Sequence, residues 1–277
     1  MEEQQETIRP LLSVVIPAFN EETRLPLTLR RVQDYLTAQS YPSELVVVDD
    51  GSSDRTAEVV GEFAAQNKNV RLIRGEHRGK GYAVRTGMLA AHGHVILFSD
   101  ADLSTPIEQI ESLMPWFERG YDIVIGSREG TGAKRIAEPL YRHLMGRVFN
   151  FLVRLLAVPG IQDTQCGFKA FRDDVVQEVF SRVQLYGEKA PRIKNGMVTA
   201  FDVEVLFLGR KLGYRIKEVP VPWRYGTETK VKPLQDSWRN FRDVLTVRLN
   251  ELQGRYNIRR AIVARGNKGW ASKVKSK

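Results

Sequence analysis

The first 127 residues alternate between short apolar runs and longer segments with helical spacing, and this alternation limits the possible folds more than any other feature. The apolar runs are rich in β-branched residues and end at polar or turn-forming residues, as buried strands do. They span 11–16, 44–48, 70–73, 95–99 and 122–125. The segments between them predict helices over 22–39, after Asp54, over 81–91 and over 106–119. Strict alternation of strand and helix predicts an α/β protein with a mostly parallel sheet covered on both faces.

The alternation stops after Ser127, and the second half of the chain is organised differently. It predicts a long helix over 138–159, a polar loop and strand over 163–171, a mostly apolar helix over 200–212, a strand over 214–220 and a final helix over 236–254. The simplest division is one elaborated α/β domain with basic C-terminal additions. We therefore expect a flexible N-terminus (1–10), a main domain (11–235), a basic amphipathic helix region (236–264) and a basic tail (265–277).

Composition excludes several classes of protein. The single cysteine allows no internal disulfide and no cysteine-based zinc site, which fits a reducing compartment. The first ten residues are polar and acidic rather than basic and then apolar, and no run of about 18 apolar residues occurs. We therefore expect neither a secretory signal nor a membrane-spanning helix. The excess behind the net charge of +9 lies in two segments, 128–158 with +4 and 238–277 with +9.

Polar residues follow four of the predicted strands. They are Asn20-Glu21, Asp49-Asp50, Asp100-Ala101-Asp102 and Ser127-Arg128. The carboxyl ends of parallel strands meet at one edge of the sheet, where ligands bind. Carboxylates gathered there repel one another unless a cation lies among them, so we expect Mg²⁺ or Mn²⁺. Asp100 and Asp102 could each reach an ion that also binds a diphosphate, although an Asp-x-Asp sequence by itself more often marks a surface turn or a helix cap.

Longer motifs extend this pattern. They are VVIPAFNEE (14–22), VVVDDGSSDRT (46–56), GKGYAVRTG (79–87), SDADLSTP (99–106), IGSR (125–128), DTQCGFKAFR (163–172), FDVE (201–204) and EVPVPW (218–223). The first four, in this order and spacing, resemble the inverting glycosyltransferases of family 2 with the A-type fold. The later four resemble the branch that glycosylates polyprenyl phosphates, and the dolichyl-phosphate β-glucosyltransferases most of all. The match covers roughly residues 11–245 and is a joint signal of several motifs.

The resemblance implies a Rossmann-like glycosyltransferase A-type fold for the main domain and in-line displacement at the anomeric carbon with inversion. It implies that a hexose, glucose favoured, passes from a UDP-sugar to a polyprenyl phosphate such as dolichyl or undecaprenyl phosphate. Asp100 and Asp102 would hold Mg²⁺ or Mn²⁺ and the diphosphate, with Ser104 as a further polar group beside the metal. The resemblance also implies a bidentate arginine clamp on phosphate. The candidate acceptor-phosphate residues are Arg128, Arg135 and Arg142.

A second group of residues suits the donor nucleotide. The candidate nucleotide-sugar residues are Pro17, Ala18, Asn20, Glu21, Asp49, Asp50, Lys80, Asp100 and Ala101. An ionised carboxylate only accepts hydrogen bonds, so Asp49 or Asp50 can bind uracil N3 or a ribose hydroxyl, and the sequence does not choose between the two. Lys80 stands between two glycines at a helix start. A mobile cation, close backbone approach and the helix dipole together suit a phosphate or the sugar there.

The acceptor decides whether catalysis needs a base. A phosphate monoester is already anionic near neutral pH, whereas a hydroxyl acceptor must lose its proton to a carboxylate. Asp163 is the candidate base and catalytic residue; alternatively, it orders the 164–168 loop or contacts sugar hydroxyls. Asp202 and Glu204 raise the same question. The alternative functions are therefore transfer to a hydroxyl of a polysaccharide, glycolipid or protein, and mannosylation of dolichyl phosphate from GDP-mannose.

Two predicted helices suit a membrane surface. On a helical wheel, segment 140–156 has a wide apolar half opposite an arginine-rich half, although an amphipathic core helix has the same pattern. The final helix has a narrower apolar stripe, formed by Phe241, Leu245, Leu249 and Leu252 and flanked by Trp238, Arg242 and Arg248. We therefore expect a peripheral enzyme at the cytoplasmic face of a membrane, with an anionic lipid surface as partner. The wide apolar face and the lack of known binding motifs argue against nucleic acid, and the oligomeric state stays open.

Overall fold

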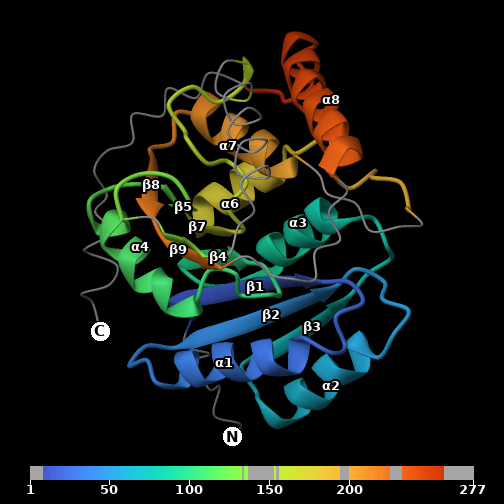
Figure 1. Cartoon of the computed structure of the whole chain (residues 1–277), viewed down its shortest axis with the longest axis vertical. Helices are drawn as coiled ribbons and strands as arrows, with labels where there is room; N and C mark the ends of the chain where they lie inside the picture. The colour runs from blue at the N-terminus through green and yellow to red at the C-terminus, as the bar shows by residue number, and fades with distance from the viewer. Residues whose placement is uncertain are drawn as a thin grey trace, which may run out of the picture.

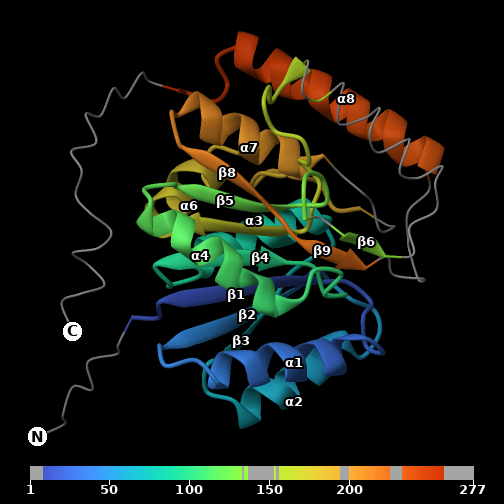
Figure 2. The same cartoon turned by 60° about the vertical axis from the view of Figure 1, so that its left-hand side comes forward.

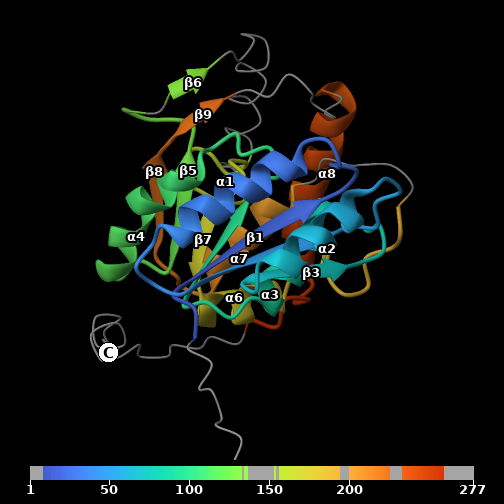
Figure 3. The same cartoon turned by 90° about the horizontal axis from the view of Figure 1, so that it is seen from below.

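The computed structural model describes residues 9–132, 134–136, 153, 156–193, 200–224 and 233–258, except for the side chains of 134–136 and 233–237. In this part of the chain, seven strands form one sheet in the order β3-β2-β1-β4-β7-β5-β8 (Figure 1). Their bounds are β1 Leu12–Ala18, β2 Ser43–Asp49, β3 Val70–Arg74, β4 Val95–Ser99, β5 Ile123–Ser127, β7 Phe168–Arg172 and β8 Ile216–Pro220. Two short strands, β6 (Lys134–Ile136) and β9 (Pro222–Arg224), pair in parallel as a separate ribbon at the edge of the molecule (Figure 3).

The sheet is mostly parallel, which confirms the α/β class expected from the sequence. Its register places Ala18 beside Asp49 and Ser127 beside Pro220, so the carboxyl ends of β1, β2, β4 and β5 lie along one edge, called the polar edge below. The exception is β7, which is antiparallel to both β4 and β5. Because Ser99 pairs with Phe168, the loop that precedes β7 also reaches the polar edge.

Helices cover both faces of the sheet. Their bounds are α1 Leu25–Thr37, α2 Thr56–Gln66, α3 Lys80–Ala90, η1 Ile107–Gln109, α4 Ile110–Glu118, α6 Asp173–Phe180, α7 Phe201–Lys211 and α8 Pro233–Leu252. One core lies under α1, α2 and α4, and the other under α3, α6 and α7. The strands supply both: Val14 and Ile16 belong to the first core and Val15 to the second. A strand buried on both faces is apolar at successive positions, as the sequence shows.

Some elements are not predicted from the sequence. α6 follows β7 at once and begins with Asp173 and Asp174, whose charges favour a helix N-terminus. β9 is also unexpected. The helix predicted over 138–159 lies outside the described residues except at its end, where Val153 and Val158 are fully buried and Leu156 packs against the same core. This end of the segment therefore contributes to the interior of the protein.

α8 lies outermost in the molecule, beyond α7 from the sheet (Figure 2). Its inner side carries two valines and three buried polar residues: Val244, Val247, Asn240, Asp243 and Asn250. Asp243 anchors the helix, because its carboxylate accepts hydrogen bonds from the Tyr186 hydroxyl at 2.8 Å and the Ala200 amide at 3.3 Å. Trp238, Leu245, Leu249 and Leu252 are exposed on the outer side. No helix in the described ranges combines the length and the apolar character that crossing a bilayer requires.

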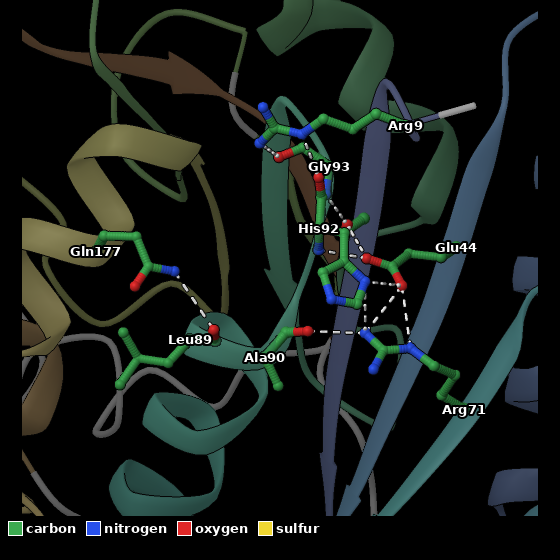
Figure 4. Close-up of polar contacts among 9 residues, drawn as sticks. Arg9, Glu44, Arg71, Leu89, Ala90, His92, Gly93 and Gln177 are labelled. Atoms are coloured by element: carbon green, nitrogen blue, oxygen red, sulfur yellow. Dashed lines mark hydrogen bonds and ion pairs between the residues drawn. The ribbon is translucent and has the colours of Figure 1, made fainter. Parts of the chain in front are cut away.

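A buried carboxylate joins the strands at the edge opposite the polar edge (Figure 4). Glu44 accepts hydrogen bonds from the Ser13 hydroxyl and the His92 amide, both at 2.6 Å, and from Arg71 Nη2 at 2.9 Å. Burial raises the pKa of Glu44, but these donors outweigh it and leave the pKa below its usual value. A carboxyl whose pKa is lowered on folding stabilises the folded state above its unfolded pKa. That contribution is lost as the pH falls through the folded pKa.

We therefore expect Glu44→Gln to lower the free energy of unfolding at pH 7 by about 1–3 kcal/mol, because it leaves buried donors without a charged acceptor. The difference from wild type should shrink as the pH falls from 7 through the folded pKa of Glu44, where the wild-type carboxyl also loses its charge. Urea denaturation across this pH range measures both effects. Glu58→Gln is the control. Glu58 forms an exposed ion pair with Arg55, so this substitution should change stability little. A pH-independent difference would contradict the prediction.

Candidate functional site

The Asp100–Ser104 turn follows β4 at the polar edge. The Asp100 amide donates to the Gly167 carbonyl at 3.1 Å, and a Cβ on Gly167 would overlap with the Asp100 carboxylate, so any other residue there would force this carboxylate to move. The exposed Asp102 carboxylate is held by the Ser104 amide at 2.9 Å and the Ser104 hydroxyl at 2.8 Å. Ser104, expected beside the metal, therefore contacts Asp102 and fixes its direction.

Lys80 forms an ion pair with this turn. It is the first residue of α3, and Gly79 before it has a φ of 97°, which favours glycine. The Lys80 Nζ lies 2.5 Å from Asp100 Oδ1, and the two side chains remain 38% and 30% exposed. The Lys80 ammonium also lies 5.4 Å from the centre of the Phe98 ring. The structure thus brings the predicted Lys80 and Asp100 together on the open side of the polar edge.

A second lysine pair lies behind the first and is missed by reasoning from the sequence. Lys169 projects from β7, is 1% exposed, and its Nζ lies 2.5 Å from Asp202 Oδ1 at the start of α7. The same ammonium also donates to the Cys166 carbonyl and lies 5.7 Å from the Phe98 ring centre. The sequence offered one signal for this pair, because Lys169 lies within an otherwise apolar strand. A cation buried there requires a carboxylate partner.

The electrostatics of the turn suit a divalent cation. Burial raises the pKa of Asp100, and the charges of Asp102 and Asp202 add to this, so Lys80 compensates only in part. Burial opposes the charge of Lys80, yet the three carboxylates outweigh it and raise its pKa. Within the described residues no three His, Cys, Asp or Glu side chains gather as a metal cage. Mg²⁺ is held in many sites by one or two carboxylates plus substrate phosphates and water, so Asp100 and Asp102 fit such an ion.

A pocket of about 250 Å³ opens beside the ends of β2 and β3. It is lined in part by Asp49, Asp50, Arg74, Glu76, Arg78 and Tyr82. The Asp50 carboxylate accepts hydrogen bonds from the amides of Arg78 at 3.0 Å and Gly79 at 2.9 Å, and lies 2.7 Å from His77 Nδ1. Asp49 Oδ1 accepts one from the Ser52 amide at 3.1 Å. Asp50 therefore orders the loop that leads to Lys80. The sequence alone did not show which of Asp49 and Asp50 has which role.

The loop after β1 completes this side of the site. Pro17 and Ala18 are buried in the strand, so they offer only backbone groups. The Asn20 side chain accepts a hydrogen bond from the Ser53 amide at 2.9 Å, and the Glu21 amide donates to Thr56 Oγ1 at 2.8 Å. These bonds tie the loop after β1 to the loop after β2. The rings of Phe19 and His77 stack at 3.7 Å across the same region, a contact that the sequence does not predict.

Arg128 and Asp163 form a rigid pair on the other side of the turn. Asp163 is fully buried and accepts hydrogen bonds from the Arg128 amide at 2.9 Å, Nε at 2.7 Å and Nη2 at 2.8 Å. Burial raises the pKa of Asp163, but Arg128 outweighs burial and holds the pKa far below its usual value. The guanidinium also lies 5.2 Å from the Trp223 ring centre. Both carboxylate oxygens are therefore engaged, and the geometry favours Asp163 as a positioning group for Arg128.

The segment of β9 and the residue before it links the Arg128–Asp163 pair to the Asp100–Ser104 turn. The Arg224 amide donates to the Ser104 carbonyl at 2.8 Å, and the Val221 amide donates to the Ser127 carbonyl at 3.0 Å. The turn that carries Asp102 and the strand end that carries Arg128 are thus fixed to the same segment. The Arg135 side chain and all of Arg142 lie outside the described residues, so their predicted roles stay predictions.

Comparison with known proteins identifies the family. Residues 13–180 match the model of glycosyl transferase family 2. The chain is 35% identical to a dolichyl-phosphate β-glucosyltransferase from Homo sapiens over 89% of this chain and 78% of the relative. It is 33% identical to one from Dictyostelium discoideum over 90% of this chain and 77% of the relative. The chain belongs to glycosyl transferase family 2. This confirms the resemblance seen in the motifs, and the protein is a glycosyltransferase.

Comparison with solved structures agrees with this family assignment. The glycosyltransferase superposes on glucosyl-3-phosphoglycerate synthase from Mycobacterium tuberculosis, solved in complex with Mn²⁺, UDP and glucosyl-3-phosphoglycerate. The TM-score is 0.53 at 18% identity, with 91% of this chain and 82% of the neighbour covered. At this identity the likeness shows the fold, which is the expected A-type.

Glu204 of the glycosyltransferase lies away from the polar edge. It is fully buried and accepts hydrogen bonds from the Gln184 amide at 2.9 Å and the Tyr256 hydroxyl at 2.8 Å. Burial raises the pKa of Glu204 to about 7. It therefore joins α7 to the 184–185 loop and to the segment after α8. Asp202, two residues earlier and so on another side of α7, is the member of the FDVE motif that pairs with Lys169 beside the site.

Proposed function

We propose that this glycosyltransferase transfers glucose from UDP-glucose to dolichyl phosphate or a similar polyprenyl phosphate, with Mg²⁺ or Mn²⁺, at the cytoplasmic face of a membrane. The observation that carries the proposal is the identity of 33–36% to proteins named dolichyl-phosphate β-glucosyltransferase over about 90% of the chain. The site described above supplies the groups that this reaction requires.

On the donor side, the nucleoside and the diphosphate would bind to adjoining residues, because the Gly79 amide before Lys80 donates to Asp50. The pocket beside Asp49 and Asp50 is the proposed nucleoside site, and the start of α3 with Lys80 is the proposed contact for the diphosphate. Asp100 and Asp102 would hold the cation. When bound, that cation neutralises negative charge developing on the departing diphosphate. The structurally related synthase, whose complex holds UDP and Mn²⁺, supports a donor and a metal of this class.

On the acceptor side, Arg128 is the proposed contact for the lipid phosphate. Asp163 and Trp223 hold its guanidinium in one direction, which suits bidentate recognition of a phosphate. A phosphate monoester attacks as an anion, so the reaction needs no general base. An Asp163 carboxylate whose oxygens are both engaged with Arg128 fits this acceptor better than a hydroxyl, which would require a proton acceptor.

The direct test is transfer of radioactive glucose from UDP-glucose into an organic phase containing dolichyl phosphate and Mn²⁺. We expect label to enter the lipid phase only when the phosphate-bearing lipid is present. Parallel reactions with UDP-galactose, UDP-N-acetylglucosamine and GDP-mannose identify the donor. Label transferred to free dolichol or to soluble hydroxyl acceptors, but not to dolichyl phosphate, would contradict the proposal.

The outer side of α8 supports the membrane part of the proposal. Trp238 is 70% exposed, Leu249 53% and Leu252 79%, whereas the polar Asn240 and Asn250 are buried on the inner side. The helix thus turns its apolar stripe outward, beside the exposed Arg242. An outward apolar stripe with adjacent arginines suits the headgroup region of an anionic bilayer.

We expect Leu249→Glu with Leu252→Glu to weaken binding to phosphatidylcholine–phosphatidylserine vesicles by about tenfold or more, because each substitution replaces an exposed leucine that would insert into the lipid with a charged residue. Vesicle co-sedimentation measures the effect. Leu27→Glu is the matched control, since Leu27 is 62% exposed and belongs to α1, which lies at the opposite end of the molecule from α8 (Figure 2). Equal loss of binding in both proteins, or none in either, would argue against α8 as the contact.

A further inference from the structure

The carboxylate proposed as a metal ligand already has a cationic partner in the chain. Lys80 Nζ is 2.5 Å from Asp100 Oδ1, a distance at which no ion fits between the two atoms. Asp102 lies two residues further along the same turn, so a cation bound by both aspartates competes with Lys80 for Asp100. Both members of the pair are partly exposed, which allows the lysine to swing away without disturbing the core.

The competition between the metal and Lys80 depends on the net charge of the surrounding side chains. Lys80 and Lys169 face the carboxylates of Asp100, Asp102 and Asp202, which leaves one net negative charge. A divalent cation added alone reverses that charge and places two cations beside one carboxylate. The diphosphate of a nucleotide brings the negative charge that lets Lys80 and the metal coexist.

Lys80 is also placed to accept the diphosphate. It begins α3, where amide groups and the helix dipole favour an anion, and its four-carbon stem is flexible. Lys169 cannot take this role, because it is 1% exposed and held by Asp202. The two lysines therefore have different functions: one is fixed within the protein and the other can change partners.

From this geometry we infer that Lys80 is an exchangeable counter-ion for Asp100. Binding of the metal displaces Lys80 from Asp100, and Lys80 moves to the nucleotide diphosphate. The exchange makes the metal bind weakly alone and tightly together with the nucleotide. By thermodynamic reciprocity the metal strengthens nucleotide binding by the same factor. The inference deepens the proposed function and rests on its assignment of Asp100 to the metal.

The test measures Mn²⁺ binding from the electron paramagnetic resonance signal of free Mn²⁺, with and without UDP. Lys80→Met keeps an unbranched apolar side chain of similar length and removes the charge. We expect it to bind Mn²⁺ alone about tenfold more tightly than wild type, and to lose most of the strengthening that UDP gives. Arg78→Met is the matched control for Mn²⁺ alone: it removes a charge from the same loop, but Arg78 contacts Glu76 and the Glu188 carbonyl instead of Asp100.

Each outcome separates the inference from the function. If Lys80→Met binds Mn²⁺ more tightly and Arg78→Met does not, the exchange is supported. Absence of a lipid product with every donor would overturn the proposed function but would leave the exchange standing. Unchanged binding in Lys80→Met overturns the exchange, and so does an equal gain in both variants, which would show a general charge effect. Lys80→Gln repeats the measurement if Lys80→Met does not fold. Absence of Mn²⁺ binding by every protein with UDP present would overturn both proposals.

Discussion

Replacing Asp102 with asparagine is expected to lower the rate of glucosyl transfer by about 10³-fold, the largest catalytic effect predicted for this protein. The substitution keeps the size of the side chain and both contacts with Ser104 nearly in place, but it removes the charge that would hold the cation. Weaker metal binding leaves the charge that develops on the departing diphosphate without its neutralising partner.

Initial rates at saturating UDP-glucose, with Mn²⁺ varied over several decades, measure the loss. Excess Mn²⁺ should restore part of the activity if the defect lies in metal affinity. Glu108→Gln, which removes an exposed carboxylate from the following turn, is the control and should leave the rate unchanged. Turnover by Asp102→Asn within tenfold of wild type at low Mn²⁺ would refute the role of this turn.

Removing the charge of Asp163 is expected to produce the largest loss of stability, about 3–5 kcal/mol in the free energy of unfolding for Asp163→Asn. The reason is that Arg128 would lose the fully buried carboxylate that accepts three of its hydrogen bonds. We also expect kcat/KM for the lipid phosphate to fall by about 10–100-fold, because the guanidinium is no longer held in one direction.

The pH profile separates positioning from base catalysis at Asp163. A positioning role predicts that the remaining activity of Asp163→Asn keeps the wild-type pH profile, and that the double variant with Arg128→Met is no worse than Arg128→Met alone. A base at this position predicts instead that Asp163→Asn loses the acidic limb of the profile and nearly all turnover. Denaturant unfolding and pH–rate measurements on the same three proteins distinguish these results.

The fold was largely predictable because its signals are local. Each strand that carries a site residue is a short apolar run, and the polar pair after it follows directly in sequence, as with Asp49 and Asp50 after β2. Because the strands are parallel, their carboxyl ends had to meet at one edge. Asp100 and Lys80 could therefore be assigned to one site before any contact between them was known.

The contacts that shape the site were not predictable in the same way. Gly167, which makes room for the Asp100 carboxylate, directly precedes the antiparallel strand β7 and is far from Asp100 in the sequence. Lys169 and Asp202 meet only because β7 enters the sheet between β4 and β5. Asp163 was equally suited to be a base or an ordering group until its three hydrogen bonds with Arg128 were seen.

The amino-acid sequence alone was enough to predict the alternation of strands and helices, the family and the groups available at the polar edge, because periodicity and motif spacing are properties of neighbouring residues. Which of those groups pair became known from the folded structure. It assigned Lys80 to Asp100 and Arg128 to Asp163, and it turned the apolar stripe of α8 outward by burying Asp243. The physical reason is that ion pairs and burial depend on distances between residues far apart in the chain, and packing of the sheet and its helices sets those distances.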